Sequence, residues 1–196
     1  MSAAPDEHLM SVEAYLALEA ASPQKRYEYL DGHVLMRLGG SRKHSMISVN
    51  VIALLGQALR ASSCFVFTSD ARVKLNGNRY VYPDVTVSCA AQSEQDEQNI
   101  SEPTLIAEVL SPSTEVYDRG QKLKRYRECP SLQTVLLIAQ EEPFVEVYRR
   151  QSVDIWTVQM YRAADEIDFD DIGVRLALSD IYARVTFIQE NTAAGG

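Results

Sequence analysis

Two acidic residues lie within short apolar runs that read as neighbouring β-strands, and no other feature restricts the fold as strongly. Asp84 precedes Val85 and Val87, and Glu108 interrupts the apolar run at 105–110. Burying a carboxylate in a strand is costly unless it is paired with a cation or bound to one. If these strands instead lie at a sheet edge, both carboxylates simply face water.

A divalent ion would resolve the buried case, because one ion between two carboxylates removes both the burial cost and their mutual repulsion. Mg²⁺ accepts a few carboxylate oxygens and keeps waters and phosphate oxygens as its remaining ligands. Lys122 follows at the start of a helix-like segment, where its amine could orient a water or stabilise transition-state charge. Asp84, Glu108 and Lys122 therefore indicate a metal-dependent phosphodiesterase site, with the two acids as metal ligands.

Longer motifs surround these three residues. The chain reads Pro83-Asp84, EVLSPST at 108–114 and DRGQKLKRY at 118–126, and it carries YEYLDG at 27–32. In these motifs, and in the segment around His44, the sequence resembles the Uma2 family of endonucleases, a branch of the PD-(D/E)xK superfamily. The resemblance implies an α/β (α+β) restriction-endonuclease-like core, with a mixed central sheet flanked by helices and an N-terminal β-hairpin extension. It also implies Mg²⁺ as cofactor, with Mn²⁺ as a substitute, DNA as substrate and a homodimer.

The catalytic lysine departs from the superfamily pattern. Two residues after the acid, where a (D/E)xK motif would place it, this chain has Leu110. The resemblance implies that the lysine has moved to the following helix, as Lys122 or Lys124. At about 100° per residue, Lys122 lies roughly 40° from the centre of the helix's apolar stripe and Lys124 roughly 160° from it, so we assign the role to Lys122. The stripe consists of Leu123, Tyr126 and Cys129.

The start of this helix is also predicted from sequence. Asp118 with Gln121 three residues later is typical of an N-cap and capping box. The helix should therefore begin near Arg119, and Pro130 should end it.

Other polar residues are candidates for the same site. Glu28 is either a third acid near the metal or an exposed hairpin residue. His44 either leans over the site or contacts a phosphate, or it faces solvent at a helix end. The resemblance implies that the backbone carbonyl of Val109 helps to bind the metal. The cations expected to hold the phosphate backbone are Arg42, Lys43 and Arg119.

Hydrophobic periodicity and turn residues predict the remaining elements. A β-hairpin is expected at 25–38, because Asp31-Gly32 is typical of a type I′ turn. Helices are expected at 11–20, 41–61 and 179–183. Strands are expected at 64–75, 79–88, 104–110, 132–139, 144–150 and 155–162. Solvated loops are expected in the acidic stretches 90–102 and 165–171, and loose ends at 1–9 and 191–196.

The 196 residues fit a single domain, 1–196, of which about 12–185 is expected to be ordered. The net charge of −8 argues against a broad nucleic-acid-binding surface, although a basic cleft or a bound ion would be enough for a nuclease. The acidic charge also favours an alternative function, namely a catalytically inactive nuclease-fold module that binds DNA or another protein.

The cysteines Cys64, Cys89 and Cys129 lie far apart and form no CxxC motif. This spacing predicts reduced thiols in a cytoplasmic protein, with Cys89 and Cys129 as small core residues. Neither a signal peptide nor an apolar run of membrane-spanning length is visible.

Overall fold

The computed structural model describes residues 9–91 and 96–187, and the predicted loose ends fall outside these ranges except for Leu9. The helices are α1 (Val12–Ala21), α2 (Arg42–Ala58), α3 (Glu115–Tyr117), the π-helical turn η1 (Asp118–Lys122), α4 (Leu123–Arg127) and α5 (Leu178–Ile181). The strands are β1 (Tyr27–Leu30), β2 (His33–Met36), β3 (Phe65–Thr68), β4 (Arg72–Leu75), β5 (Arg79–Val81), β6 (Val85–Ser88), β7 (Asn99–Ile100), β8 (Leu105–Leu110), β9 (Thr134–Ala139), β10 (Phe144–Arg150), β11 (Trp156–Arg162), β12 (Glu166–Phe169) and β13 (Val174–Ala177).

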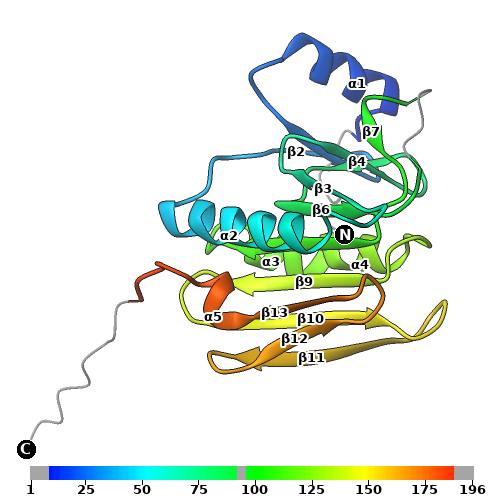
Figure 1. The fold of residues 1–196 in the computed structure, drawn as a ribbon. Helices are drawn as coiled ribbons and strands as arrows, with labels where there is room; N and C mark the ends of the chain where they lie inside the picture. The colour runs from blue at the N-terminus through cyan, green and yellow to red at the C-terminus, as the bar shows by residue number, and fades with distance from the viewer. Residues whose placement is uncertain (1–8, 92–95, 188–196) are drawn as a thin grey trace, which may run out of the picture.

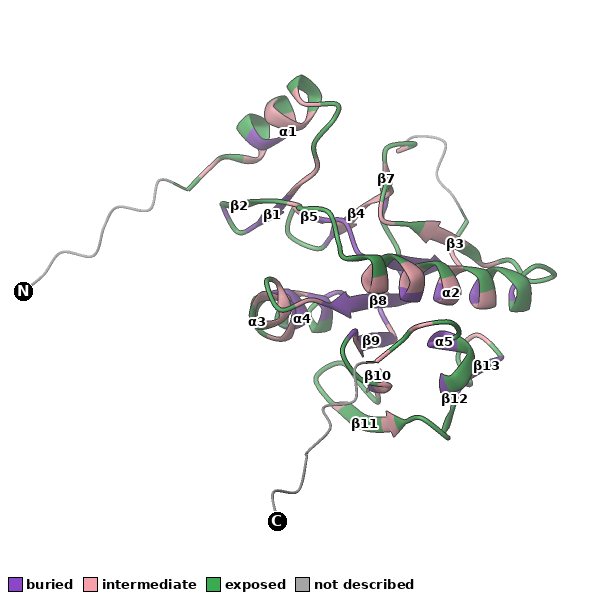
Figure 2. Ribbon diagram, turned by 90° about the vertical axis from the view of Figure 1, so that its left-hand side faces the viewer, coloured by how far each residue is buried: buried purple, intermediate pink, exposed green. Residues whose placement is uncertain are grey.

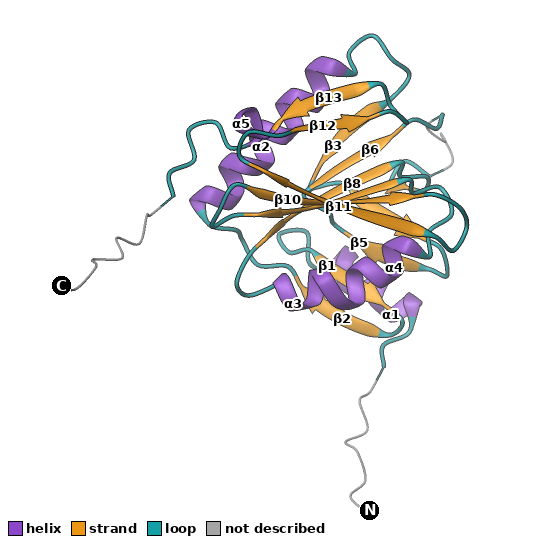
Figure 3. Ribbon diagram, turned by 90° about the horizontal axis from the view of Figure 1, so that it is seen from below, coloured by secondary structure: helices purple, strands orange, loops and turns teal. Residues whose placement is uncertain are grey.

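Most strands belong to two sheets. The larger sheet has the order β11-β10-β9-β8-β6-β3, and the smaller one β2-β1-β5-β4-β7. In the larger sheet only the β8–β9 pair is parallel, and α3, η1 and α4 form the crossover between these two strands. Figure 3 shows α2, α5 and the β12–β13 hairpin on one side of the large sheet and α3 and α4 on the other. This mixed, helix-flanked sheet confirms the predicted fold class.

The two faces of β8 enter different cores, and this directs Glu108. Leu105 and Ala107 pack in the core that contains α2, whereas Ile106 and Leu110 pack in the core that contains α4. Side chains alternate along a strand, so Glu108 shares the α4 side with Ile106 and Leu110. Strand β8 is buried along its whole length, as Figure 2 shows, and the exposed-edge alternative for Glu108 is therefore wrong.

The N-terminal elements agree with the sequence analysis. Ser11 caps α1 by accepting a hydrogen bond from the N–H of Ala14. The β1–β2 hairpin turns at Asp31 and Gly32, whose φ angles of 53° and 96° are those that a type I′ turn needs. The predicted helix at 41–61 is α2, which Ser41 caps and whose buried residues Ile47, Val51 and Leu55 pack in the core beside the large sheet.

Two predicted strands are each broken in two. The stretch 64–75 forms β3 and β4, and 79–88 forms β5 and β6, with the members of each pair in different sheets. Pro83 lies at the second break, where it lacks the N–H that a continuing ladder would need. Asp84 follows it directly, so this acid lies where the chain crosses from one sheet to the other.

The acidic stretches were also predicted too simply. Within 165–171, strand β12 buries Ile167 and Phe169 against the main core and exposes the acidic residues between them. The short strand β7 lies in the other acidic stretch and pairs with β4. The acidic composition therefore concealed a period-two pattern typical of strands.

The predicted helix start is wrong. Helical structure begins at Glu115, and Asp118 lies inside it, 5% exposed. The N–H of Leu123 donates to the carbonyl of Asp118, five residues earlier, which is the hydrogen bond of a π-turn. Asp118 is therefore not an N-cap. Its side chain is buried, and its Oδ1 lies 3.8 Å from Lys122 Nζ.

The prediction of reduced thiols is wrong for two of the three cysteines. Cys64 precedes β3 and Cys89 follows β6, and the register places Phe65 opposite Ser88. The two cysteines therefore face each other across the strand pair and form a disulfide, whereas Cys129 is free and buried as predicted. None of the helices in the described ranges has both the length and the apolar character needed to cross a membrane.

Candidate functional site

The three residues predicted to be catalytic and the two additional candidates, Glu28 and His44, line one pocket of about 380 Å³. It lies among the β1–β2 hairpin, the start of α2, the end of β8 and the η1 turn. Those five residues are Glu28, His44, Asp84, Glu108 and Lys122. All of them except His44 are only 3% exposed, so the acids and the lysine form the floor of the pocket.

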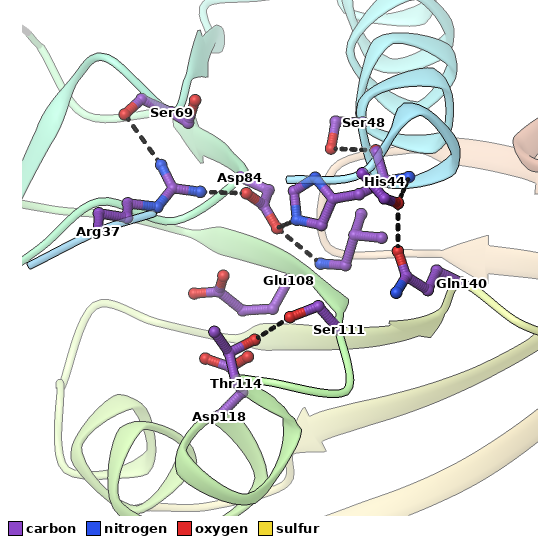
Figure 4. A network of polar contacts seen from close by, with 12 residues as sticks. Arg37, His44, Ser48, Ser69, Asp84, Glu108, Ser111, Thr114, Asp118 and Gln140 are labelled. Carbon is purple, nitrogen blue, oxygen red and sulfur yellow. Dashed lines mark hydrogen bonds and ion pairs between the residues drawn. The ribbon is translucent and has the colours of Figure 1, made fainter. Parts of the chain in front are cut away.

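Asp84 is fixed from three directions, as Figure 4 shows. Its Oδ2 accepts a hydrogen bond of 2.8 Å from the N–H of Val109, the residue after Glu108. The Arg37 guanidinium donates to Oδ1, and His44 Nε2 lies 3.1 Å from Oδ2. The antiparallel register of β6 and β8, continued by one residue, places Asp84 opposite Glu108.

His44 reaches Asp84 because the start of α2 is held in place. Ser41 accepts the N–H of His44 at 3.1 Å and donates its own hydroxyl to Gln140 at 2.8 Å. At Gly40 a Cβ atom would lie 2.5 Å from His44 Nδ1, so only glycine leaves room for the imidazole. The solvent-facing alternative for His44 is therefore wrong, since its side chain is only 16% exposed.

Lys122 lies between two acids that come from different parts of the chain. Its Nζ is 2.9 Å from Glu108 Oε1 and 2.8 Å from Glu28 Oε1, and 3.8 Å from Asp118 Oδ1. Lys124, by contrast, is exposed. The structure thus brings Lys122 and not Lys124 to the pocket, as the helical phase predicted.

Glu28 is a buried member of the site and not an exposed hairpin residue. Besides its ion pair with Lys122, its Oε1 accepts the N–H of Tyr82 at 3.0 Å. It therefore ties the hairpin to the segment that leads into Asp84.

The two acids on the strands have opposite electrostatic properties. Burial raises the pKa of Asp84, but the hydrogen bond from His44 and the charge of Arg37 outweigh burial, so the pKa lies below its ordinary value. At Glu108 burial dominates, and the charge of Lys122 offsets it only in part. Neighbouring acids add to the shift, so the pKa of Glu108 rises to about 8. Without a bound cation Glu108 therefore tends to hold a proton near neutral pH, whereas Asp84 stays ionised.

The family model Uma2, described as "Putative restriction endonuclease", matches residues 12–179. The chain belongs to the Uma2 family. Two Synechocystis proteins are similar to it over most of their length. "Uncharacterized protein slr1290" is 36% identical over 179 residues, which cover 91% of this chain and 94% of the relative. "Uncharacterized protein sll1609" is 30% identical over 165 residues, which cover 82% and 93%.

A crystal structure of "a putative nuclease belonging to DUF820" from Anabaena variabilis has a similar fold. Its TM-score is 0.69, and the match covers 88% of this chain and 97% of that one at 20% sequence identity. The likeness supports the architecture of this Uma2 chain, the large sheet and its flanking helices.

Sequence reasoning missed three residues of this Uma2 site. Arg37 pairs with Asp84, Asp118 faces Lys122, and the Tyr126 hydroxyl donates to Glu108. The signal for Arg37 was present, because it interrupts the apolar run at 34–38 as Glu108 interrupts its own strand. Tyr126 was assigned to the apolar stripe for its ring, and its hydroxyl gave no periodic signal.

Two of the three predicted phosphate-binding cations already form ion pairs with glutamates. Lys43 pairs with Glu141 at 2.6 Å, and Arg119 pairs with Glu115 at 2.7 Å and Glu146 at 2.6 Å. Arg42 is exposed at the start of α2.

The charges in the pocket of this Uma2 protein fit a hard divalent cation. Four acids border it but only two side chains that are always cationic. The acids are Glu28, Asp84, Glu108 and Asp118, and the cations are Arg37 and Lys122. Among the described residues no three His, Cys, Asp or Glu side chains converge as a ready-made metal cage. Such a set suits Mg²⁺, which uses one or two carboxylates and takes its other ligands from water and phosphate.

Proposed function

We propose that this Uma2 protein is a metal-dependent endonuclease that hydrolyses phosphodiester bonds in DNA. One observation carries the proposal. Asp84, directly before β6, Glu108, in the neighbouring strand β8, and Lys122, from the η1 turn, meet at the floor of one pocket with the lysine Nζ 2.9 Å from Glu108. A DNA substrate would also place the protein's action in the cytoplasm.

Each residue has a distinct role in this proposal. Asp84 and Glu108 would hold Mg²⁺, or Mn²⁺ in its place. When bound, the ion supplies acidity to a water and neutralises charge on the phosphate. Lys122 would orient the attacking water and stabilise charge on the phosphate oxygens. Arg37 and His44 hold Asp84 in position, and Glu28 does the same for Lys122.

The first prediction tests the proposal directly. Purified protein should cleave DNA oligonucleotides with Mg²⁺ or Mn²⁺ and should not cleave them in EDTA, as seen on denaturing gels. An Asp84→Asn protein prepared in parallel should be inactive under every condition, because it lacks a charged metal ligand. Cleavage that persists in EDTA, or equally in Asp84→Asn, would contradict the proposal and indicate a contaminant.

A second candidate function has its own supporting observation. Lys122 lies between Glu28 and Glu108, and Arg37 pairs with Asp84, so each of these buried acids already has a cationic partner. A pocket held together in this way could serve an inactive binding module. The metal titration in the Discussion separates the two functions, because such a module has no need of the ion.

We also propose that the protein is a homodimer that pairs through β11. Within the described residues β11 pairs only with β10, and its Val158 and Met160 are 46% and 63% exposed. The N–H of Gln151 donates to the carbonyl of Ile155 at 2.8 Å. Hydrogen bonds alternate along an antiparallel ladder, so the even-numbered residues of β11 direct their backbone groups away from β10. This edge is open to another strand.

A two-fold axis at Gln159 makes β11 complementary to itself. Val158 would then lie opposite Met160 of a second copy, and Trp156 opposite Arg162. No like charges meet in this register, and cross-strand apolar and cation–aromatic pairs are favourable.

The second prediction concerns this dimer. Met160→Asp should convert a dimer to a monomer in analytical ultracentrifugation, because two carboxylates would enter the paired edge. Phe65→Asp is the matched control, since Phe65 is 51% exposed on β3 at the opposite edge of the same sheet. A monomeric wild type at high micromolar concentration, or a dimer that only the Phe65 variant disrupts, would contradict the assignment.

A further inference from the structure

We infer that the pocket takes an unpaired nucleic-acid strand and not the interior of a duplex. The inference rests on the proposed nuclease function and adds the form of its substrate. The first observation is depth. Asp84, Glu108 and Lys122 are each 3% exposed at the floor of a pocket of about 380 Å³. A phosphodiester must therefore enter the pocket to meet them, and a flat approach along the surface is not enough.

The second observation is the apolar mouth. Leu35, which lies opposite Glu28 in the hairpin, and Leu38 line the pocket and are 44% and 70% exposed, so they form part of its opening. These side chains come from β2 and the residues that follow it. An intact duplex presents phosphates and sugars to a protein surface, and apolar side chains offer those groups nothing. An unpaired strand can turn the faces of its bases toward the protein.

The third observation is charge. Duplex DNA carries roughly one negative charge per 1.7 Å of axis, and one strand about half of that density. Binding it requires free lysines and arginines, but two of the three predicted for the phosphate backbone, Lys43 and Arg119, are paired with glutamates, which leaves Arg42, exposed at the start of α2. Arg37 is likewise paired with Asp84. A single strand, with fewer phosphates to neutralise, suits a chain whose net charge is −8.

The fourth consideration is geometry. Enzymes that do chemistry on a base inside a pocket take that base out of the stack or act on strands that are already single, and a base that enters this mouth meets the same requirement. In an unpaired strand a base can rest on Leu35 and Leu38 while the adjacent phosphate descends toward Lys122. In a paired strand the stack holds that base away from the mouth, and the phosphate stays with it.

The test compares three fluorescent DNA probes of the same sequence, which are a single strand, a blunt duplex and a hairpin with an unpaired loop. Binding is measured by anisotropy in EDTA, and cleavage is measured on gels with Mn²⁺. We expect the single strand to bind at least about tenfold more tightly than the duplex, with cuts in the hairpin confined to its loop. A duplex that binds as tightly as the single strand, or no binding of any probe, overturns the inference. Absence of cleavage despite single-strand binding overturns the proposed nuclease function and leaves the inference standing.

Matched variants assign the effect to the mouth. The double variant Leu35→Ser/Leu38→Ser should lose most single-strand affinity, several-fold or more, and keep the melting temperature because both residues are exposed. Val153→Ser is the control, since Val153 is 79% exposed in the turn between β10 and β11 and does not line the pocket. An unchanged affinity in the double variant, or an equal loss in the control, overturns the role of the apolar mouth.

Discussion

Replacing Lys122 by methionine is expected to lower metal-dependent cleavage by at least about a hundredfold, the low end of what a positioned proton-transfer group contributes. The substitution keeps the length of the side chain and removes its charge. It leaves Glu28 and Glu108, which Lys122 contacts at 2.8 and 2.9 Å, without their shared cation. Loss of one partner from a buried ion pair typically costs about 3–5 kcal/mol of stability. The variant should therefore lose both activity and stability, and urea denaturation measures the second effect.

Lys124→Met is the control for this experiment, because Lys124 lies two residues further along the same helical segment and is exposed. Its activity and its urea midpoint should match those of the wild type. Cleavage is measured well below the melting temperature of each variant, with circular dichroism to verify folding. If Lys122→Met is folded and active, or if Lys124→Met is the inactive protein, the assignment of the lysine is wrong.

Glu108→Gln is expected to remove most of a pH dependence in the stability of the metal-free protein. Burial and neighbouring acids raise the pKa of Glu108 to about 8 from an ordinary 4.5. Between these two values the folded protein holds a proton that the unfolded chain releases. The contribution of Glu108 to stability is therefore complete below pH 4.5 and is lost as the pH rises to 8. The wild type in EDTA should melt lower at pH 8.5 than at pH 5.5, by on the order of 5 °C more than Glu108→Gln does.

Mg²⁺ should reverse this loss. An ion that binds only the folded protein raises the melting temperature, and it competes with the proton on Glu108. The rise should thus be larger at pH 8.5 than at pH 5.5, and nearly absent in Glu108→Gln. A wild type that does not respond to Mg²⁺ at either pH would contradict the metal site and favour the inactive binding module.

Asp84→Asn provides the contrast in the same experiment. Arg37, His44 and the Val109 N–H all stabilise the Asp84 carboxylate, and its pKa is lowered. The folded protein gains stability from this group above its ordinary pKa and loses it as the pH falls below that value. Removing the charge should therefore destabilise the metal-free protein at neutral pH by roughly 1–3 kcal/mol. If Asp84→Asn lowers the stability of the metal-free protein and Glu108→Gln raises it at high pH, the two acids are held differently before any ion binds.

Parts of the site that depend on local periodicity could be predicted from the sequence. The apolar stripe of the helical segment placed Lys122 inward and Lys124 outward, and the structure places both residues in this way. The Asp31-Gly32 turn fixed the β1–β2 hairpin, because few residue pairs adopt positive φ at both positions. Glu108 stood out because a charge within an apolar strand needs a partner.

Features that depend on distant partners could not be predicted. Nothing within a few residues of Cys64 indicates Cys89, which faces it only through the register of β3 and β6. Asp118 matched a capping box by spacing alone, and the π-turn that buries it shifts the local hydrogen bonds by one residue. The breaks after β3 and β5 lie where the chain leaves one sheet for the other, at Ser69-Asp70 and at Pro83, and only the sheet order shows that the flanking strands have different partners.

The sequence by itself determined which residues are candidates, since the apolar strand around Glu108, the Pro83-Asp84 pair and the inward phase of Lys122 are local properties of the chain. Only the tertiary structure decided how they are paired. It placed Arg37 and His44 on Asp84, and it placed Lys122 between Glu28 and Glu108. The physical reason is that the charge balance of a buried group depends on every element packed around it. Here those elements lie as many as 94 residues apart along the chain, as in the pair of Glu28 and Lys122.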